Sequence, residues 1–535
     1  MLFNSPIFIF AFLPVAVAVF YAISAANLAR AFLWLIAASL FFYAWWRPLN
    51  VLLIAPSIAL NYLAADFLIR RQTERPRLAS VVFWCAIVFN ICFIGYFKYI
   101  SFLATVSNDV FGSDLMIQSV ALPLGVSFIT FQKIALLVDA RSGRVQQVGL
   151  RDYVLFVLFF PPLISGPIVH FRELMPQFKA MDGRWYWENA AAGLGLFFAG
   201  LFKKLVLADP IAVLINPIWS DAASGGHPAL LQAWAAALGY MVQLYFDFSG
   251  YSDMATGAAR LFGIKLPTNF NSPLKAASII DYWSRWHMTL TRFLTAYIFS
   301  PITLAFARRR MARDVPGMAG RRTTPAAFLQ LLALPTIITM LVSGLWHGAG
   351  YQFLIFGALH GVALVVNHAW RLWQPKSWNH APAARYWAWP ATILFVIFVE
   401  VFFRASDIAS ALRVIHGMLG SDGIALPSAL ASGPGRVLTM LGMKFGVSSE
   451  GGNAFVLTWV LVGLAWTIAL AMPNTLEIFA KLQPTLDFRL RGDRERRVAW
   501  AQWRPSAAWT LGMSAVALLG LMSLGHVSAF LYWQF

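Results

Sequence analysis

Histidine is the residue type in this chain whose surroundings most directly suggest chemistry. Three of the nine histidines lie in short motifs: His347 in "SGLWHGAG", His287 in "DYWSRWHMTLTRF" and His360 in "FGALHGVALVVNH". A neutral imidazole can accept a proton from an attacking hydroxyl or thiol near neutral pH, which is what acyl transfer requires. Taken alone, however, each of these histidines is more typical of a hydrogen-bonded structural residue in a helix bundle.

The small residues beside His347 favour a chemical role for this histidine. In "SGLWHGAG" the glycines and the alanine leave room for another backbone or for a ligand to approach the imidazole. We therefore predict that His347 is a general base. The remaining histidines that we considered lack such a setting and are expected to be structural: His368, His380, His416 and His526.

Metal chemistry is disfavoured by the residues near these histidines. The sequence has no HExxH motif, no carboxylate at ligand spacing beside His287, His347 or His360, and no cysteine next to them. We expect no metal site and no tightly bound cofactor. Cys85 and Cys92 lie in one apolar run and are expected to be reduced packing residues.

The segment "DYWSRWH" places Asp281 and Arg285 four residues apart, so the two side chains meet on one face if this piece is helical. Two interpretations remain open. The pair could neutralise itself beside the membrane and orient the His287 segment. It could equally be a local ion pair at the membrane interface, with the neighbouring Trp283 and Trp286 acting as interface anchors.

A second polar patch stands in "YFDFSGYSDMATG", residues 245–257, with apolar sequence on both sides. Asp247, Ser249, Ser252 and Asp253 would be costly in lipid, so they require an interior lined by water or by protein. The sequence does not decide between a catalytic and an architectural role for this patch.

The elements that position these residues are expected to be membrane-spanning helices. Of the 535 residues, 59% are hydrophobic and only 12% are charged, which indicates an all-α polytopic membrane protein with one integral-membrane domain over 1–535. Apolar runs long enough to span lie near 6–23, 28–46, 49–69, 79–97, 151–169, 190–209, 229–247, 325–345, 351–370, 387–404, 454–472 and 507–530. Shorter, re-entrant or interfacial pieces are expected at 115–138, 274–304 and 407–419, and a loop with one short helical piece at 421–453.

The net charge of +18 collects in short loops beside these spans and not on one soluble surface, so nucleic acid is not an expected partner. The loops 70–77, 308–322 and 489–497 are rich in arginine, and the positive-inside rule places them in the cytoplasm, where they also attract anionic membrane lipids. Both chain ends are then expected in the periplasm. The apolar N-terminus has no Lys or Arg before its core and is expected to be retained as the first span.

The same motifs carry a family resemblance. "QLYFDFSGYSDMATGAARLFGIKLPTNFNSP", "DYWSRWHMTLTRFL", "SGLWHGAGYQFLIFGALHG" and the closing "FLYWQF" resemble the membrane-bound O-acyltransferases of the alginate O-acetyltransferase branch. So do "FFYAWW", "GYFKYISF", "LPLGVSFITFQKI" and "ISGPIVHFREL", and together they cover nearly the whole chain in order.

This resemblance implies a bundle of about 12 tilted and re-entrant helices around a transmembrane tunnel, with the catalytic region at about 240–370. The essential histidine of the family's LWHG motif falls on His347, and that of its RWH motif on His287. Implied partners are acetyl-CoA as acyl donor, a polysaccharide acceptor and a periplasmic SGNH-hydrolase-like acetyltransferase. Tunnel-lining or supporting candidates are Asp247, Ser249, Asp253, Asn269, Asn271, Asp281, Arg285, Trp286, Trp346 and His360.

The chain departs from the family pattern after the RWH motif. Family members typically have an Arg-Asp-Tyr stretch that leads to "LGGN", whereas this chain reads "FLTAYIFSPITLAFARRR". The resemblance therefore does not carry over the cytoplasmic mouth of the tunnel, and it does not identify the polymer as alginate.

These observations lead to a first hypothesis of a bacterial inner-membrane O-acetyltransferase for an alginate-like or cellulose-like exopolysaccharide. Acetyl-CoA would enter from the cytoplasm, His347 would act as general base, and His287 would hold the donor or stabilise the oxyanion. No Ser or Cys nucleophile adjoins either histidine, which favours direct transfer over an acyl-enzyme. Two alternatives remain: a polysaccharide or lipid-linked-sugar transporter or flippase without chemistry, and a scaffold that anchors a polysaccharide synthase.

Overall fold

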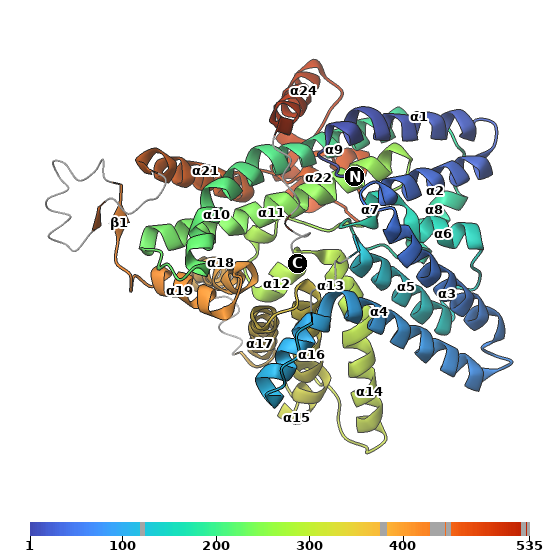
Figure 1. Cartoon of the computed structure of the whole chain (residues 1–535), viewed down its shortest axis with the longest axis horizontal. Coiled ribbons are helices and arrows are strands. Elements are labelled where there is room, and N and C mark those ends of the chain that lie inside the picture. Colours follow the sequence, from blue (N-terminus) through green and yellow to red (C-terminus); the bar gives the residue numbers. More distant parts are fainter. Residues whose placement is uncertain (118–122, 375–381, 428–443, 446–450, 526–530, 532–535) are drawn as a thin grey trace. The chain divides into compact units, whose positions relative to one another are not determined.

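The structure is a computed structural model that describes residues 1–117, 123–374, 382–427, 444–445, 451–525 and 531 (Figure 1). The expectation of an all-α fold is confirmed. The strands in the described part of the chain are the two-residue segments β1 (Ala425–Leu426) and β2 (Lys444–Phe445), which pair in parallel. Most of the predicted loop 421–453, His380, His526 and all of the closing "FLYWQF" except Leu531 lie outside the described residues.

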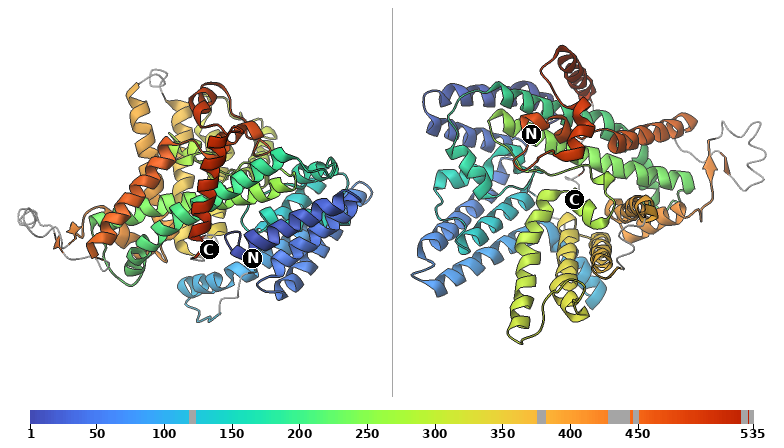
Figure 2. Two further views of the ribbon diagram at one scale, coloured as in Figure 1. Left: turned by 90° about the horizontal axis from the view of Figure 1, so that it is seen from above. Right: turned by 180° about the vertical axis from the view of Figure 1, so that it is seen from behind.

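The chain folds into two compact units, and the first comprises Met1–Phe202, Gly250–Asn269 and Thr475–Gln534. In this unit α3, α4 and α5 pack against one another, as do α1 and α2, and α9 packs against α24; Figure 2 shows α3, α4 and α5 from two further directions. Its helices are α1 (Leu13–Ser24), α2 (Leu28–Ala44), α3 (Leu49–Arg71), α4 (Pro76–Phe111), α5 (Val126–Arg141), α6 (Leu150–Leu158), α7 (Phe160–Leu163), α8 (Phe171–Lys179), α9 (Trp187–Phe202), α22 (Thr475–Ile478), α23 (Gly492–Val498) and α24 (Ala507–Met522).

The second unit comprises Lys203–Ser249 and Phe270–Asn474. Helix α11 (Leu230–Leu261) contributes residues to both units. The other helices of the second unit are α10 (Asp209–Ala223), α12 (Ile279–Trp283), α13 (Met288–Leu294), α14 (Ser300–Met311), α15 (Pro325–Phe328), α16 (Leu334–His347), α17 (Tyr351–Trp373), α18 (Pro382–Arg404), α19 (Ile408–Met418) and α21 (Gly451–Ala471). All three histidines singled out by the sequence belong to this unit.

Eight helices of the described chain are long and apolar enough to cross a membrane, judged by length and composition. They are Leu49–Arg71, Pro76–Phe111, Met288–Met311, Pro325–His347, Tyr351–Trp373, Tyr386–Arg404, Gly452–Ala471 and Ala507–Gly525. The apolar helices Phe8–Ser24, Leu28–Ala44 and Ile408–Met418 are shorter. The hydropathy pattern therefore located most of the helices, although their lengths differ from those predicted.

Two predicted segments are corrected by the structure. The run 151–169 is not one span, because α6 ends at Leu158 and α7 is a four-residue helix that contains Pro161 and Pro162. Proline removes a backbone donor and clashes with the preceding turn, so the helix cannot continue. The piece 274–304 is interrupted only in its first part: from Met288 to Met311 it is a continuous helix of spanning length.

The two cysteines also differ from expectation. Cys85 and Cys92 are free thiols, as predicted, but both are exposed on α4 and do not pack in the protein core. Only 17% of the most apolar 18-residue stretch of α4 is buried within the protein. Most side chains of this stretch therefore face outward. Apolar side chains on such a surface are suited to contact with lipid.

Glycines bring α16 and α17 into backbone contact just before His347. A Cβ added at Gly344 would lie 2.2 Å from the carbonyl oxygen of Phe353, and one at Gly357 would lie 2.4 Å from the carbonyl oxygen of Met340. Small residues permit this close approach between membrane helices. The sequence predicted that small residues near His347 leave room for another backbone or a ligand. At Gly344 that room is occupied by the backbone of α17.

Gly357→Ala should therefore force α16 and α17 apart and lower the thermal unfolding midpoint of the detergent-solubilised protein. Overpacking of this kind typically costs about 1–3 kcal/mol. Gly463→Ala on α21 is the matched control, because a Cβ at Gly463 meets nothing within 4 Å. Equal midpoints for the two variants would show that the α16–α17 contact is not tight.

Candidate active site

His347 ends α16 and is surrounded by aromatic rings. Its exposed fraction is 4%, and its ring centroid lies 4.7 Å from that of Trp346, 5.0 Å from Phe403 and 5.9 Å from Phe356. Gly348 follows in an extended conformation, and a Cβ there would lie 2.0 Å from the Phe353 ring. Glycine is therefore required at this position for the chain to leave the helix beside Phe353.

His287 lies one aromatic side chain away from His347. Its ring is completely buried, packs edge-on to Phe248 at 4.7 Å and lies 5.8 Å from Trp346, which also contacts His347. His287 connects α12 to α13 with φ +42°, in the left-handed region. Non-glycine residues in this region store strain and concentrate at functional sites.

His360 is held by a hydrogen bond from tryptophan. Trp283 Nε1 donates to His360 Nδ1 at 3.3 Å, so the neutral imidazole carries its proton on Nε2. Phe356 packs against both His360, at 4.7 Å, and His347, at 5.9 Å. The structure thus links the three histidines in the order His287, Trp346, His347, Phe356, His360, which we call the histidine–aromatic chain.

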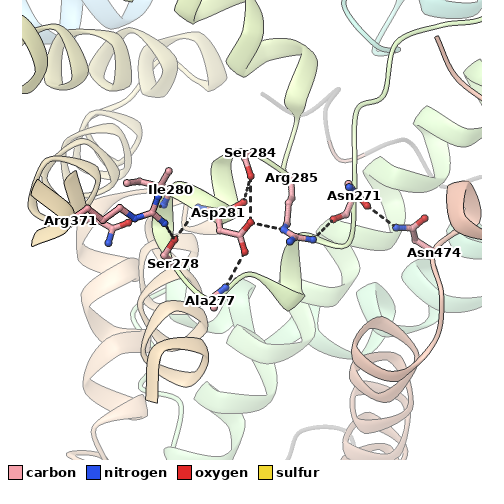
Figure 3. Close-up of polar contacts among 10 residues, drawn as sticks. Asn271, Ala277, Ser278, Ile280, Asp281, Ser284, Arg285, Arg371 and Asn474 are labelled. Atoms are coloured by element: carbon pink, nitrogen blue, oxygen red, sulfur yellow. Dashed lines mark hydrogen bonds and ion pairs between the residues drawn. The ribbon is translucent and has the colours of Figure 1, made fainter. Parts of the chain in front are cut away.

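The Asp281–Arg285 ion pair braces the segment that leads into His287 (Figure 3). Arg285 Nε lies 2.7 Å from Asp281 Oδ1, and the Arg285 guanidinium donates to the Asn271 carbonyl at 3.4 Å. The backbone N–H of Asn271 donates to the Arg285 carbonyl at 3.0 Å. The Asn474 side chain donates to the Asn271 side-chain oxygen at 3.1 Å. The pair thereby ties α12 to the preceding loop.

Trp283 and Trp286, which neighbour this pair in the sequence, are buried and are not exposed membrane anchors. Trp286 stacks on Tyr282 at 5.7 Å and packs edge-on to Phe270 at 5.1 Å. Trp283 is the hydrogen-bond donor to His360. Of the two interpretations left open by the sequence, orientation of the His287 segment agrees better with these contacts.

The patch at 245–257 divides into two settings. In the second unit, Asp247 forms an ion pair with Lys204 at 2.5 Å, and the same ammonium lies 2.7 Å from Asp209. Lys204 is 2% exposed, so we call these three residues the buried ion triad. Ser249 is also buried.

The rest of this patch belongs to the first unit. Asp253 accepts a hydrogen bond from Thr475 at 2.7 Å, and Asn269 donates to Ser252 at 3.0 Å. The interior that holds these side chains is therefore lined by protein. Asp253 and Asn269 lie in a different unit from the histidine–aromatic chain, whereas Asp247, Ser249, Asn271, Asp281, Arg285, Trp286, Trp346 and His360 lie in the same unit as that chain.

Several residues that build the site were not singled out from the sequence. Phe356 and Phe403 pack on His347, Phe248 packs on His287, and Lys204 neutralises Asp247. The lysine was detectable, because "LFKKLVLADP" places two lysines in an apolar run. The phenylalanines gave no such signal in a chain with 45 of them.

Comparison with known proteins relates the chain to a family. The sequence model of the membrane-bound O-acyltransferase family matches residues 82–313. A peptidoglycan O-acetyltransferase of Helicobacter pylori is 39% identical over 454 residues, which cover 80% of this chain and 81% of that protein. The chain belongs to the membrane-bound O-acyltransferase family.

Other relatives of this O-acyltransferase differ in the substrates that their names state. A probable alginate O-acetylase, AlgI, of Pseudomonas aeruginosa is 34% identical over 78% of this chain and 75% of its own length. A teichoic acid D-alanyltransferase of Bacillus subtilis is 28% identical over 51% of this chain and 65% of its own length. The enzyme is thus an O-acyltransferase whose relatives act on several cell-surface polymers.

The histidine–aromatic chain contains two kinds of group that acyl transfer can use. An imidazole can take the proton of an attacking hydroxyl, and a second imidazole can donate a hydrogen bond to the oxygen that becomes negative. The surrounding aromatic rings exclude water, which strengthens such electrostatic contacts. Among the described residues, no group of three or more His, Cys, Asp or Glu side chains could hold a metal ion.

Lys204→Met should strongly destabilise the enzyme, because it leaves the buried Asp247 carboxylate without its cation. Removing one partner of a buried ion pair typically costs about 3–5 kcal/mol. The measurement is the thermal unfolding midpoint and yield in detergent, with Lys481→Met as control, because Lys481 is exposed. The double variant Lys204→Met/Asp247→Leu should regain part of the loss; a Lys204→Met protein as stable as the control would show that the triad contributes little.

Proposed function

We propose that this enzyme transfers an acetyl group from acetyl-CoA to hydroxyl groups of a cell-surface polysaccharide at the bacterial inner membrane. The observation that carries this proposal is the position of His347 at the end of α16, one indole ring from His287. The names of the two O-acetylating relatives, each aligned over more than three-quarters of this chain, support acetyl as the acyl group and a polysaccharide as the acceptor.

The proposed chemistry is direct transfer. The acceptor hydroxyl attacks the thioester carbonyl, so a C–O bond forms and the C–S bond breaks. His347 takes the proton from the hydroxyl and returns it to the departing thiolate, which leaves no net proton to be released. His287 donates a hydrogen bond to the carbonyl oxygen while that oxygen carries negative charge.

The donor is proposed to approach from the cytoplasmic side. Arg308 and Arg309 at the end of α14 are exposed, as is Arg313 in the following loop, whereas Arg310 is buried and donates to Gln330 at 3.0 Å. Exposed guanidinium groups suit the phosphates of acetyl-CoA. Because Arg310 is buried and hydrogen-bonded, it anchors the end of α14 that carries Arg308 and Arg309 and leads into the loop with Arg313.

The product is proposed to leave on the periplasmic side, either directly on the polymer or through an SGNH-hydrolase-like partner. An alginate-like or cellulose-like polymer remains the proposed acceptor, with peptidoglycan added by the Helicobacter pylori relative. Radiolabelled acetyl-CoA supplied to the purified enzyme, with each polymer in turn, tests this choice. Label transferred to none of them, with or without the partner, would contradict the proposed function and favour transport without chemistry.

His347→Ala should abolish acetylation while the amount of protein in the membrane stays nearly unchanged. A general base contributes about 10²–10⁴-fold to rate, and polymer acetyl content is the readout. His416→Ala is the matched control, because His416 is exposed on α19 and is expected to be structural. Wild-type acetylation by the His347→Ala enzyme at matched expression would remove His347 from the mechanism.

Membrane sidedness can be tested with single cysteines in a background that lacks Cys85 and Cys92. Arg313, in a basic loop, is expected to face the cytoplasm, and Arg47, in the loop between α2 and α3, the periplasm; both are exposed. A membrane-impermeant thiol reagent on spheroplasts should label Arg47→Cys at once and Arg313→Cys only after the membrane is opened. The reverse pattern would put the donor in the wrong compartment. The predicted periplasmic position of both chain ends follows from the same rule.

A further inference from the structure

The second unit holds a group of polar side chains that the proposed mechanism does not use, four of them buried and one, Arg404, half-buried. It consists of Trp219 on α10, Tyr240 and Gln243 on α11, and Glu400 and Arg404 on α18, and we call it the Glu400 cluster. Each member has one buried polar atom without a hydrogen-bond partner among the described residues. These atoms are Trp219 Nε1, the Tyr240 hydroxyl, Gln243 Oε1, Glu400 Oε2 and Arg404 Nε.

Direct contacts bring three of these side chains together, and helix geometry relates the other two to them. The Trp219 and Tyr240 rings are 6.0 Å apart, and the Arg404 guanidinium lies over both, at 5.5 Å and 5.9 Å. Gln243 is three residues after Tyr240 on α11, and Glu400 is four residues before Arg404 on α18, so each pair shares a helix face. Glu400 is also close enough to act electrostatically on the Tyr240 phenol.

Such a concentration of unmatched polar atoms calls for a physical explanation. Buried polar groups in proteins are nearly always hydrogen-bonded, and those without a protein partner usually bind water or a ligand. The requirement is stricter for Glu400, which is 2% exposed in a helix of membrane-spanning length. Ionisable residues in such positions usually face a wet or ligand-binding interior.

One helix, α18, connects the cluster to the proposed general base. Phe403, the residue before Arg404, packs edge-on to His347 at 5.0 Å and to Phe356 at 5.0 Å. The α18 helix therefore supplies both a wall of the histidine–aromatic chain and two members of the Glu400 cluster.

The unmatched atoms define the chemistry of that ligand. Trp219 Nε1 and Arg404 Nε can only donate, Gln243 Oε1 can only accept, and the Tyr240 hydroxyl can do either. Glu400 and Arg404 carry opposite charges when both are ionised, so neither a phosphate-bearing donor nor a metal cation is favoured. Hydroxyl groups both donate and accept without carrying charge, and a saccharide presents several of them side by side.

We propose that the Glu400 cluster binds the hydroxyl groups of a saccharide unit of the acceptor and holds one of them toward His347. This inference rests on the proposed function, because it assigns the acceptor side of the same reaction. Its members are binding and positioning residues, and His347 remains the proposed base.

Two conservative substitutions separate ligand binding from a structural role. Tyr240→Phe and Glu400→Gln each remove or neutralise an atom that has no protein partner, so no hydrogen bond of the fold is lost. The full-length variants in detergent should unfold at the wild-type midpoint or above it. Tyr386→Phe and Glu495→Gln are the controls, because both residues are exposed.

The probes are two uncharged trisaccharides, chitotriose and cellotriose, and binding is followed by saturation-transfer NMR. At least one should bind the wild-type enzyme and both controls, and Tyr240→Phe and Glu400→Gln should each weaken that binding about tenfold or more. Failure of both sugars to bind the wild type, or equal binding by the variants and controls, would overturn the inference. So would a large fall in the unfolding midpoint of both variants, because the atoms would then serve the fold.

Acetyl-CoA turnover by the wild-type enzyme, measured in the same preparation, keeps this inference distinct from the proposed function. Turnover together with equal sugar binding by variants and controls would leave the function standing and remove the site. Sugar binding that depends on Tyr240 and Glu400, without any transfer of acetyl groups, would keep the site and contradict the function.

Discussion

The second unit depends on the neutralisation of charge in its interior, and the buried ion triad is the clearest case. Lys204 lies between Asp209 and Asp247 at the π-helical turn Lys203–Ala208 that precedes α10. A lone carboxylate at Asp247 would be costly in a low-dielectric interior. With the ammonium in place, α11 can run through apolar surroundings past Phe248, the residue that packs on His287.

Packing of rings connects the three histidines in sequence order along the site. Trp346 touches His287 and His347, and Phe356 touches His347 and His360. The glycines of α16 and α17 are what allow these rings to converge, because they remove the side chains that would separate the two backbones. The site is thus assembled by close helix packing.

The sequence was informative where one residue type carries a strong physical requirement. Apolar runs located most helices because a spanning segment must satisfy its own backbone groups, and the glycines beside His347 indicated a close approach. Pairings across long sequence separations could not be predicted from the sequence, because tertiary packing sets them. Examples are Trp283 with His360, Thr475 with Asp253, and Lys204 with Asp247. The break at Pro161 and Pro162 was readable but was outweighed by the hydropathy of its neighbours.

Helix α4 has a consequence for the surrounding membrane. Its 36 residues give a rod of about 54 Å at about 1.5 Å per residue, whereas the hydrocarbon core of a bilayer is about 30 Å thick. Such a rod either tilts steeply or extends beyond the hydrocarbon into the headgroup region, and the lipids beside it must adapt. Because α4 packs against α3 and α5 within the first unit, a change in bilayer thickness that tilts α4 would also displace these helices. The lipid composition of the host membrane is therefore one of the conditions under which this enzyme works.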